Sequence, residues 1–199
     1  MSTTFLQQKT KNGTVTLEQY FDFEWDAEGR HQFINGKIEP MAYSTDQHGD
    51  LTFNLVFLLQ KHFFSDPLVK GYSENRMLYV AACNRVYYPD LMLLTAPQEF
   101  YFYKKLKATT NPTVVIEVLS KSTQKTDRNE KRDCYLQIET LRQYILIAQD
   151  RPLMEIYNRQ NDGSWQLSKH SNLTEEVAIH TAKISLADIY RKVVFTNVD

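Results

Sequence analysis

Two carboxylates stand inside or beside apolar runs of the sequence. Glu117 interrupts the apolar run 113–119, and Asp90 follows Pro89 at the mouth of the apolar run 91–94. A carboxylate is rarely buried without a partner, because the loss of hydration is costly. Two carboxylates on adjacent strands repel each other unless a divalent cation or a proton lies between them. Oxygen ligands suit Mg²⁺ or Mn²⁺, so Asp90 and Glu117 predict a metal site.

A metal site of this kind is suited to phosphodiester hydrolysis. The ion polarises a phosphate and generates hydroxide at neutral pH, and a fixed cation must stabilise the developing charge. Leu119 occupies the position where a lysine would share the face of the strand carboxylate, and Lys121 lies past the strand's end. Lys131 is the better candidate, because it precedes Cys134 and Tyr135 of an apolar helix stripe by three and four residues. The alternative is a solvated helix residue.

Glu117 has a purely structural interpretation as well. A buried glutamate can serve only to pair with a lysine or an arginine that holds the fold together. In that case Glu117 and Lys131 would satisfy each other and would take no part in chemistry.

The segment 104–132 carries a local excess of five positive charges on a chain whose net charge is −1. Such an excess can contact phosphates, and the aromatic residues at 101–103 could stack on bases. The alternative is a solubilising loop and helix face. The candidate nucleic-acid contacts are Lys104, Lys105, Lys107, Lys121, Lys125 and Arg128.

His48 precedes Gly49 at the start of the longest predicted helix. Its imidazole could bind a phosphate or position a water molecule, or it could be a capping or surface residue. The sequence contains no glycine-rich phosphate loop, no Cys/His zinc spacing and no nucleophile elbow, so no organic cofactor is expected.

The composition is that of an ordinary globular protein of 199 residues, with 42% hydrophobic and 13% aromatic residues. We expect a mobile lead-in over 1–14 and a single domain over 15–199. The net charge gives no global argument for nucleic acid or membrane. Cys83 and Cys134 have no metal-ligand spacing and form no disulfide framework, which favours a reducing compartment. The N-terminus lacks the apolar core of a signal peptide, and no apolar run could span a bilayer, so we expect a cytoplasmic protein.

The hydrophobic spacing predicts an α/β fold with a central mixed sheet flanked by helices. Segment 95–112 is irregular, and Asp127 and Glu130 occupy positions like those of a capping box. The other expected elements are helices at 16–25, 45–64, 127–140 and 185–194, a hairpin over 30–43 with its turn at Asn35-Gly36, and strands at 76–82, 85–94, 113–119, 143–149, 153–159 and 164–170.

The order of these motifs resembles the Uma2 family of restriction endonuclease-like proteins, also called DUF820 and abundant in cyanobacteria. The resemblance covers about 16–192. Its most specific elements are Pro89-Asp90, the run Glu117-Val-Leu-Ser and the pair Lys131-x-x-x-Tyr135. It implies a PD-(D/E)xK nuclease core that cleaves DNA with Mg²⁺ or Mn²⁺.

The resemblance also implies roles for particular residues. Asp90 and Glu117 would be the metal ligands, and Lys131 would be an active-site lysine that has moved from the strand to the helix. His48-Gly49 matches the family's His-Gly at the start of the long helix. A homodimer is expected by analogy with the fold.

The sequence departs from the family pattern in the hairpin. The family has Tyr-Glu-Leu-Ile-Asp-Gly where this chain has residues 31–36, so Gln32 replaces the Glu and Asn35 the Asp. Gln32 can accept a hydrogen bond or weakly ligate a cation, but it cannot act as an anion or a base. The sequence therefore leaves two functions open: a metal-dependent DNA endonuclease, and a nuclease-fold protein that binds nucleic acid or a protein partner without cutting.

Overall fold

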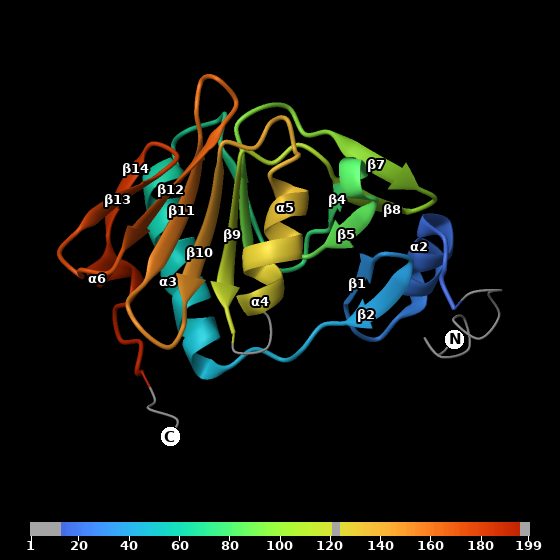
Figure 1. The fold of residues 1–199 in the computed structure, drawn as a ribbon, viewed down its shortest axis with the longest axis horizontal. Coiled ribbons are helices and arrows are strands. Elements are labelled where there is room, and N and C mark those ends of the chain that lie inside the picture. The colour runs from blue at the N-terminus through green and yellow to red at the C-terminus, as the bar shows by residue number, and fades with distance from the viewer. Residues whose placement is uncertain (1–12, 121–123, 196–199) are drawn as a thin grey trace.

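The structure is a computed structural model that describes residues 13–120 and 124–195. The predicted lead-in, apart from Gly13 and Thr14, and the candidate Lys121 therefore lie outside the described residues. The described part of the chain forms two six-stranded sheets and a two-stranded one, with few helices (Figure 1). The predicted α/β class is confirmed, although the sequence indicated one large sheet and the structure has two.

The central sheet is mixed and has the order β12-β11-β10-β9-β6-β3. Only β9 and β10 run parallel, and the other neighbours are antiparallel. Both faces of β9 are covered, by α3 (Asp46–Phe63) on one side and by α5 (Arg132–Tyr135) on the other (Figure 1), so its residues are buried throughout. The strands are β3 (Lys70–Ser73), β6 (Leu91–Leu94), β9 (Val114–Leu119), β10 (Gln143–Ala148), β11 (Met154–Arg159) and β12 (Trp165–His170).

The second sheet has the order β2-β1-β5-β4-β8-β7 and packs against α2 (Leu17–Asp26). Thr16 caps α2 in a capping box with Gln19. The predicted hairpin is confirmed, because Asn35 and Gly36 both have the positive φ that its two-residue turn needs. The strands are β1 (His31–Ile34), β2 (Lys37–Pro40), β4 (Leu78–Val80), β5 (Arg85–Tyr87), β7 (Phe100–Tyr103) and β8 (Leu106–Thr109).

The prediction that segment 95–112 is irregular was wrong, because β7 and β8 form a hairpin there. Lys104 adopts the turn with a φ of 51°, without the glycine or asparagine that marks such turns in a sequence. The alternation along β7 is also hidden, because its four residues are all aromatic.

The run 85–94, predicted as one strand, divides between the two sheets. It enters the second sheet as β5 and the central sheet as β6, with Tyr88-Pro89-Asp90 between them. Pro89 has no N–H to contribute to a ladder, so the break falls at this point. Asp90 thereby comes to lie where the two sheets meet.

The predicted helix 127–140 is shorter and less regular than its pattern suggests. It consists of α4 (Gln124–Thr126), the π-helical turn η2 (Asp127–Lys131) and α5, and the chain continues in turns. The capping prediction was wrong, since Asp127 pairs with Lys131 and Glu130 with Arg85. Wide turns of this kind are frequent at functional sites.

The C-terminal part supports the opposite face of the central sheet. β13 (Glu176–Ile179), β14 (Ala182–Ser185) and α6 (Leu186–Ile189) pack with α3 into one core. Among the described residues, no helix is long and apolar enough to cross a membrane.

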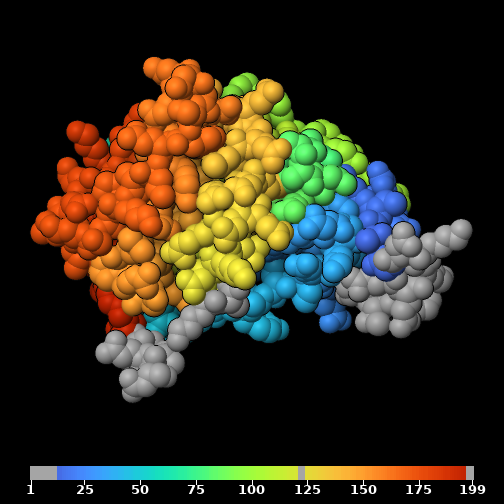
Figure 2. All heavy atoms as spheres, in the orientation of Figure 1, coloured from blue at the N-terminus to red at the C-terminus, as the bar shows by residue number. Residues whose placement is uncertain are grey.

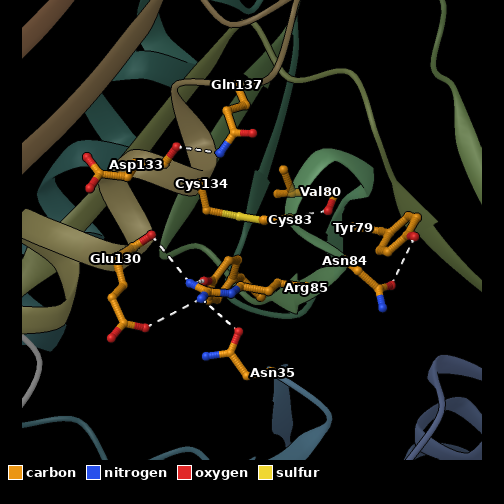
Figure 3. The surroundings of a disulfide bond; sticks show 11 residues. Asn35, Tyr79, Val80, Cys83, Asn84, Arg85, Glu130, Asp133, Cys134 and Gln137 are labelled. Carbon is orange, nitrogen blue, oxygen red and sulfur yellow. Dashed lines mark hydrogen bonds and ion pairs between the residues drawn. A yellow bond between two sulfur atoms is a disulfide. The ribbon is translucent and has the colours of Figure 1, made fainter.

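Cys83 and Cys134 form a disulfide, contrary to the expectation of unpaired thiols (Figure 3). The bond joins the short helix η1 (Ala81–Cys83) to α5. Beside it, Arg85 donates to Oδ1 of Asn35 at 2.8 Å and pairs with Glu130 at 3.5 Å. These contacts fix η2 and α5 against the second sheet.

Loss of the disulfide should lower stability without changing the fold. A loop of 51 residues is closed by the bond, which the chain-entropy relation converts to roughly 4 kcal/mol. We therefore expect Cys83→Ser/Cys134→Ser to unfold at a lower urea concentration than the oxidised wild type. Reducing the wild type with dithiothreitol should give the same decrease. An oxidised wild type with two thiols titratable by Ellman's reagent would contradict the assignment.

Candidate active site

A cavity of about 640 Å³ lies between the two sheets. It is bounded by β1, by the start of α3, by the ends of β6 and β9 that face each other, and by η2. In Figure 2 the surface of segment 124–141 lies between the strands of the central sheet and the N-terminal strands of the second. The five catalytic residues predicted from the sequence all line this cavity: Gln32, His48, Asp90, Glu117 and Lys131.

Strand register brings the two candidate metal ligands together. In the antiparallel pair of β6 and β9, Leu91 lies opposite Ile116, so one step further along Asp90 comes opposite Glu117. Oδ2 of Asp90 accepts a hydrogen bond of 2.7 Å from the backbone N–H of Val118. Its Oδ1 lies 3.1 Å from Nε2 of His48. Asp90 is therefore held in place by the neighbouring strand and by α3.

Glu117 is buried on the face of β9 that packs against η2 and α5. Its Oε1 accepts a hydrogen bond of 3.0 Å from the Tyr135 hydroxyl and lies 2.7 Å from Nζ of Lys131. Within the described part of the chain, no donor contacts Oε2, and Glu117 lines the cavity. One oxygen of this carboxylate is thus fixed and the other is available to a ligand.

Lys131 projects from the π-helical turn onto the sheet, as its position before Cys134 and Tyr135 indicates. It is 5% exposed, and Nζ contacts Asp127 at 3.3 Å in addition to Glu117. Burial alone would lower the pKa of Lys131, but the carboxylates of Glu117 and Asp127 outweigh it and raise this pKa. Lys131 is therefore an ammonium ion that neutralises part of a buried acidic cluster.

The pKa of Glu117 moves toward neutrality. Burial raises it to about 8, and the nearby Asp90 and Asp127 act in the same direction, while Lys131 offsets only part of the effect. An extra positive charge in the cavity would favour the ionised form. The site thus has the electrostatic character of a place that gains stability from a cation.

His48 is positioned by the start of α3. The side chain of Thr45 caps this helix by accepting from the backbone N–H of His48. Burial lowers the pKa of His48, but the hydrogen bond and charge of Asp90 outweigh it and raise this pKa. The Nε2–H of His48 therefore donates to the Asp90 carboxylate. The side chain contacts a candidate metal ligand and is not simply a capping or surface residue.

The structure adds an acid that the sequence gave no reason to select. Ligand atoms of Glu74, His48 and Asp90 lie within 4.8 Å of one another, a group that could hold a metal ion. Glu74 has a φ of 33°, unusual for a residue with a side chain, and its backbone N–H donates to the carbonyl of Asp90. Glu74 lies just beyond the short edge strand β3, where no buried run draws attention to it.

The candidate nucleic-acid residues do not all lie at this cavity. Arg128 lines it, although its Nε donates to Glu155 at 2.7 Å. Lys125 lies on α4 beside it. The structure places the other described candidates on the β7–β8 hairpin near α2: Lys104 pairs with Asp22, Lys105 lies over Trp25 and Lys107 over Phe100.

The donor set fits a hard divalent cation. Among the described residues that line the cavity, six carboxylates face four arginine and lysine side chains. An anionic substrate would be repelled by this balance unless a cation offset it. Carboxylate oxygens with one imidazole are ligands suited to Mg²⁺ or Mn²⁺. The residues present thus support the use of a divalent metal, but they do not distinguish between these ions.

A mixed sheet covered by helices on both faces, with two acids and a lysine on one cavity beside it, is typical of a restriction endonuclease-like fold. A crystal structure described as "a putative nuclease belonging to DUF820 from Anabaena variabilis ATCC 29413" superimposes on this chain with a TM-score of 0.71. The superposition covers 90% of this chain and 99% of that one, at 16% identity. This likeness shows the fold.

The chain belongs to the Uma2 family. The family profile, described as "Putative restriction endonuclease", matches residues 17–187. The chain is also similar to the uncharacterized protein sll1609 of Synechocystis sp. (strain ATCC 27184 / PCC 6803 / Kazusa), with 31% identity over 170 residues, or 85% of this chain and 95% of the relative. The uncharacterized protein slr1290 of the same strain is 25% identical over 183 residues, 91% of this chain and 94% of that protein.

The raised pKa of Glu117 predicts a pH dependence of stability in the metal-free protein. The Glu117 carboxyl has a pKa of about 8 in the folded protein and 4.5 in the unfolded chain, so the folded state holds its proton more tightly. The stability that this proton contributes is fully present below pH 4.5 and is lost as the pH rises through 8. In EDTA, the free energy of unfolding of the wild type should therefore fall, relative to that of Glu117→Gln, between pH 5 and pH 8.5. Urea titrations at several pH values measure it. A constant difference between the two proteins would contradict the shift.

Proposed function

We propose that this protein is a metal-dependent DNA endonuclease of the Uma2 type. The single observation that carries the proposal is the convergence of Asp90, Glu117 and Lys131 on one cavity, from two strands and a helical turn. Membership of a family described as restriction endonucleases supports a nuclease-type activity. The metal requirement and the choice of DNA as substrate belong to the proposal.

Asp90 and Glu117 would hold the metal ion. Oε2 of Glu117 accepts no hydrogen bond from the described residues, and the strand register places Asp90 opposite Glu117. The Asp90 carboxylate is held by a backbone N–H of β9 and by His48. Bound there, Mg²⁺ or Mn²⁺ would polarise a phosphate and make a water molecule more acidic. Gln32, at the side of the cavity, would contribute a neutral amide oxygen, while Glu74 provides a third carboxylate.

The chain's own residues would bind and orient the phosphate. Lys131 has three N–H donors, and its two carboxylate partners leave one for an anionic oxygen. Its position in a buried acidic cluster keeps it charged, which suits stabilisation of the charge that develops on phosphorus. His48 would position the carboxylate of Asp90 through the 3.1 Å contact.

The nucleic acid would lie along the opening of the cavity. Arg128 and Lys125 from the helical segment would contact phosphates, and Tyr43, whose side chain is fully exposed at the rim, could stack on a base. The lysines of the β7–β8 hairpin would be reached only by a duplex that extends beyond the second sheet. Because both sheets line the cavity, we propose that residues 15–199 act as one domain.

A cytoplasmic location stays a prediction, and the disulfide bears on it. Disulfides are rare in a reducing cytosol. Blocking free thiols at the moment of cell lysis, followed by mass spectrometry of Cys83 and Cys134, would show which state the pair has in the cell.

Cleavage of supercoiled plasmid tests the proposal. Wild type should nick the plasmid in Mg²⁺ or Mn²⁺ and lose this activity in EDTA. Asp90→Asn, Glu117→Gln and Lys131→Met should each reduce the rate by at least about a hundredfold. Asp162→Asn is the control, since this exposed carboxylate lies in the turn between β11 and β12 and does not line the cavity. Undiminished nicking by the double variant Asp90→Asn/Glu117→Gln would show that these two carboxylates are not the catalytic metal ligands.

The replacement of an acid by Gln32 favours a second function, binding without cleavage. Calorimetry separates the two, because the nuclease requires Mn²⁺ or Mg²⁺ to bind at millimolar concentration. Retention of DNA binding without any metal binding would indicate that the protein binds nucleic acid without cleaving it. The reverse change, Gln32→Glu, should increase cleavage if the missing acid limits the reaction.

The purely structural interpretation of the ion pair makes its own prediction. Lys131→Met alone leaves the buried carboxylates of Glu117 and Asp127 without their shared partner and should cost about 3–5 kcal/mol of stability. Adding Glu117→Gln removes one of these two charges and should recover part of that loss, while Asp127 still lacks Lys131. If the double variant also keeps full nicking activity, the pair is structural and the proposed mechanism is wrong.

A further inference from the structure

The outer face of α3, together with the residue that caps its C-terminal end, carries three exposed phenylalanines in one row. Phe53, Phe57 and Phe64 are 74%, 59% and 81% exposed. At 100° per residue they lie within a sector of about 40° on the helix. Leu68, 71% exposed, follows in the turn beyond the helix. Isolated exposed apolar residues are normal, but a row of large ones on one helix marks an interaction surface.

Polar residues frame this row in a definite order. Asp46 and Asp50 lie on the same face at the N-terminal end, and Lys61 lies at the C-terminal end, all exposed. Neither Asp50 nor Lys61 forms an ion pair with any residue that the structure describes. The row therefore has an acidic end and a basic end. Arg191 and, more weakly, Lys61 lower the pKa of Asp188, although Lys61 forms no ion pair with it.

We infer that this face of α3 binds the same face of a second copy of the chain, antiparallel and about a twofold axis. A twofold axis near residue 55 places Phe53 of one copy against Phe57 of the other. It also brings the acidic end of each helix to the basic end of its partner, with Asp50 near Lys61. A self-complementary patch is what an isologous interface requires.

Glycine at position 49 supports close approach of the two helices. Gly49 lies on the same exposed face, and the space around its Cα is open. In the antiparallel register, residue 49 of one copy comes beside residues 60 and 61 of the other. The absence of a side chain there gives room for the long side chain of Lys61 and for the ring of Phe64.

The size of the patch suits a modest dimer. The exposed parts of the three rings amount to roughly 400–500 Å², about half or somewhat more of the roughly 800 Å² that each partner contributes to a standard interface. The helix is about 27 Å long, and its polar residues and Leu68 would supply the rest. A second copy fits these features better than a membrane surface, because the row ends in two aspartates.

The dimer would leave the active-site cavity open. His48, which faces the cavity, lies on the opposite side of α3 from the row of phenylalanines, at about 200° from it. The inference therefore does not depend on the proposed nuclease activity, and each can fail without the other.

Sedimentation over a wide range of protein concentration tests the inference. The full-length wild type should associate to a dimer, and Phe57→Asp should weaken association at least about tenfold. Phe102→Asp is the matched control, because Phe102 is 67% exposed on β7, away from α3, and its replacement should leave the dimer unchanged. A wild type that stays monomeric at every concentration, or a dimer unaffected by Phe57→Asp, would overturn it.

Exchange of the charges supplies a test that does not require removing apolar surface. Asp50→Lys and Lys61→Glu should each weaken self-association, because each variant places like charges opposite each other. An equimolar mixture of these two variants should form a heterodimer, and the double variant Asp50→Lys/Lys61→Glu should regain the homodimer. The antiparallel register would be contradicted if neither the mixture nor the double variant associates. Unchanged circular dichroism would show that the variants are still folded.

Discussion

Burial of the Glu117 carboxylate is the constraint on which the site depends. β9 is covered on both faces, so the charge of Glu117 cannot be hydrated as it would be at a surface. Lys131 compensates it at 2.7 Å, and Tyr135 adds a hydrogen bond to the same oxygen. Burial, with the further negative charge of Asp90 and Asp127 in the same small volume, is the reason that one lysine is not enough to keep the pKa of Glu117 low. An acidic cluster that one lysine compensates only in part is stabilised further by a proton or by a cation nearby.

Several irregular features of the fold serve to place these groups. The break at Pro89 carries Asp90 to the boundary between the two sheets. The π-helical turn η2 directs Lys131 and Asp127 to the same side, and the disulfide and Arg85 hold this turn against the second sheet (Figure 3). Each feature departs from regular secondary structure, and each lies beside the cavity. The positive φ of Glu74 belongs to the same pattern, in which local strain accompanies a functional site.

Much of this arrangement was predictable from residue types. Glu117 and Asp90 differ from their apolar surroundings, and the positions of Cys134 and Tyr135 indicate that Lys131 faces the sheet. The hairpin at Asn35-Gly36 follows from its turn residues. The β7–β8 hairpin with a lysine at positive φ and the end of the helix at Tyr135 have no local signal and were missed. The split of run 85–94 between two sheets was also missed, although Pro89 marks its position. The contribution of Glu74 depends on a tertiary contact between β3 and the start of β6, which no spacing along the chain reveals. The Cys83–Cys134 bond likewise joins positions 51 residues apart.

The proposed mechanism needs a divalent cation at Asp90 and Glu117, and a crystal soaked in Mn²⁺ tests this requirement most directly. Diffraction at a wavelength where manganese scatters anomalously would locate the ion without reference to activity. We predict an anomalous peak within ligand distance of both Asp90 and Glu117, which disappears in Asp90→Asn/Glu117→Gln crystals. Saturating Mn²⁺ that leaves no peak there, with Lys131 still paired to Glu117, would contradict the account and leave the buried cluster as a structural ion pair.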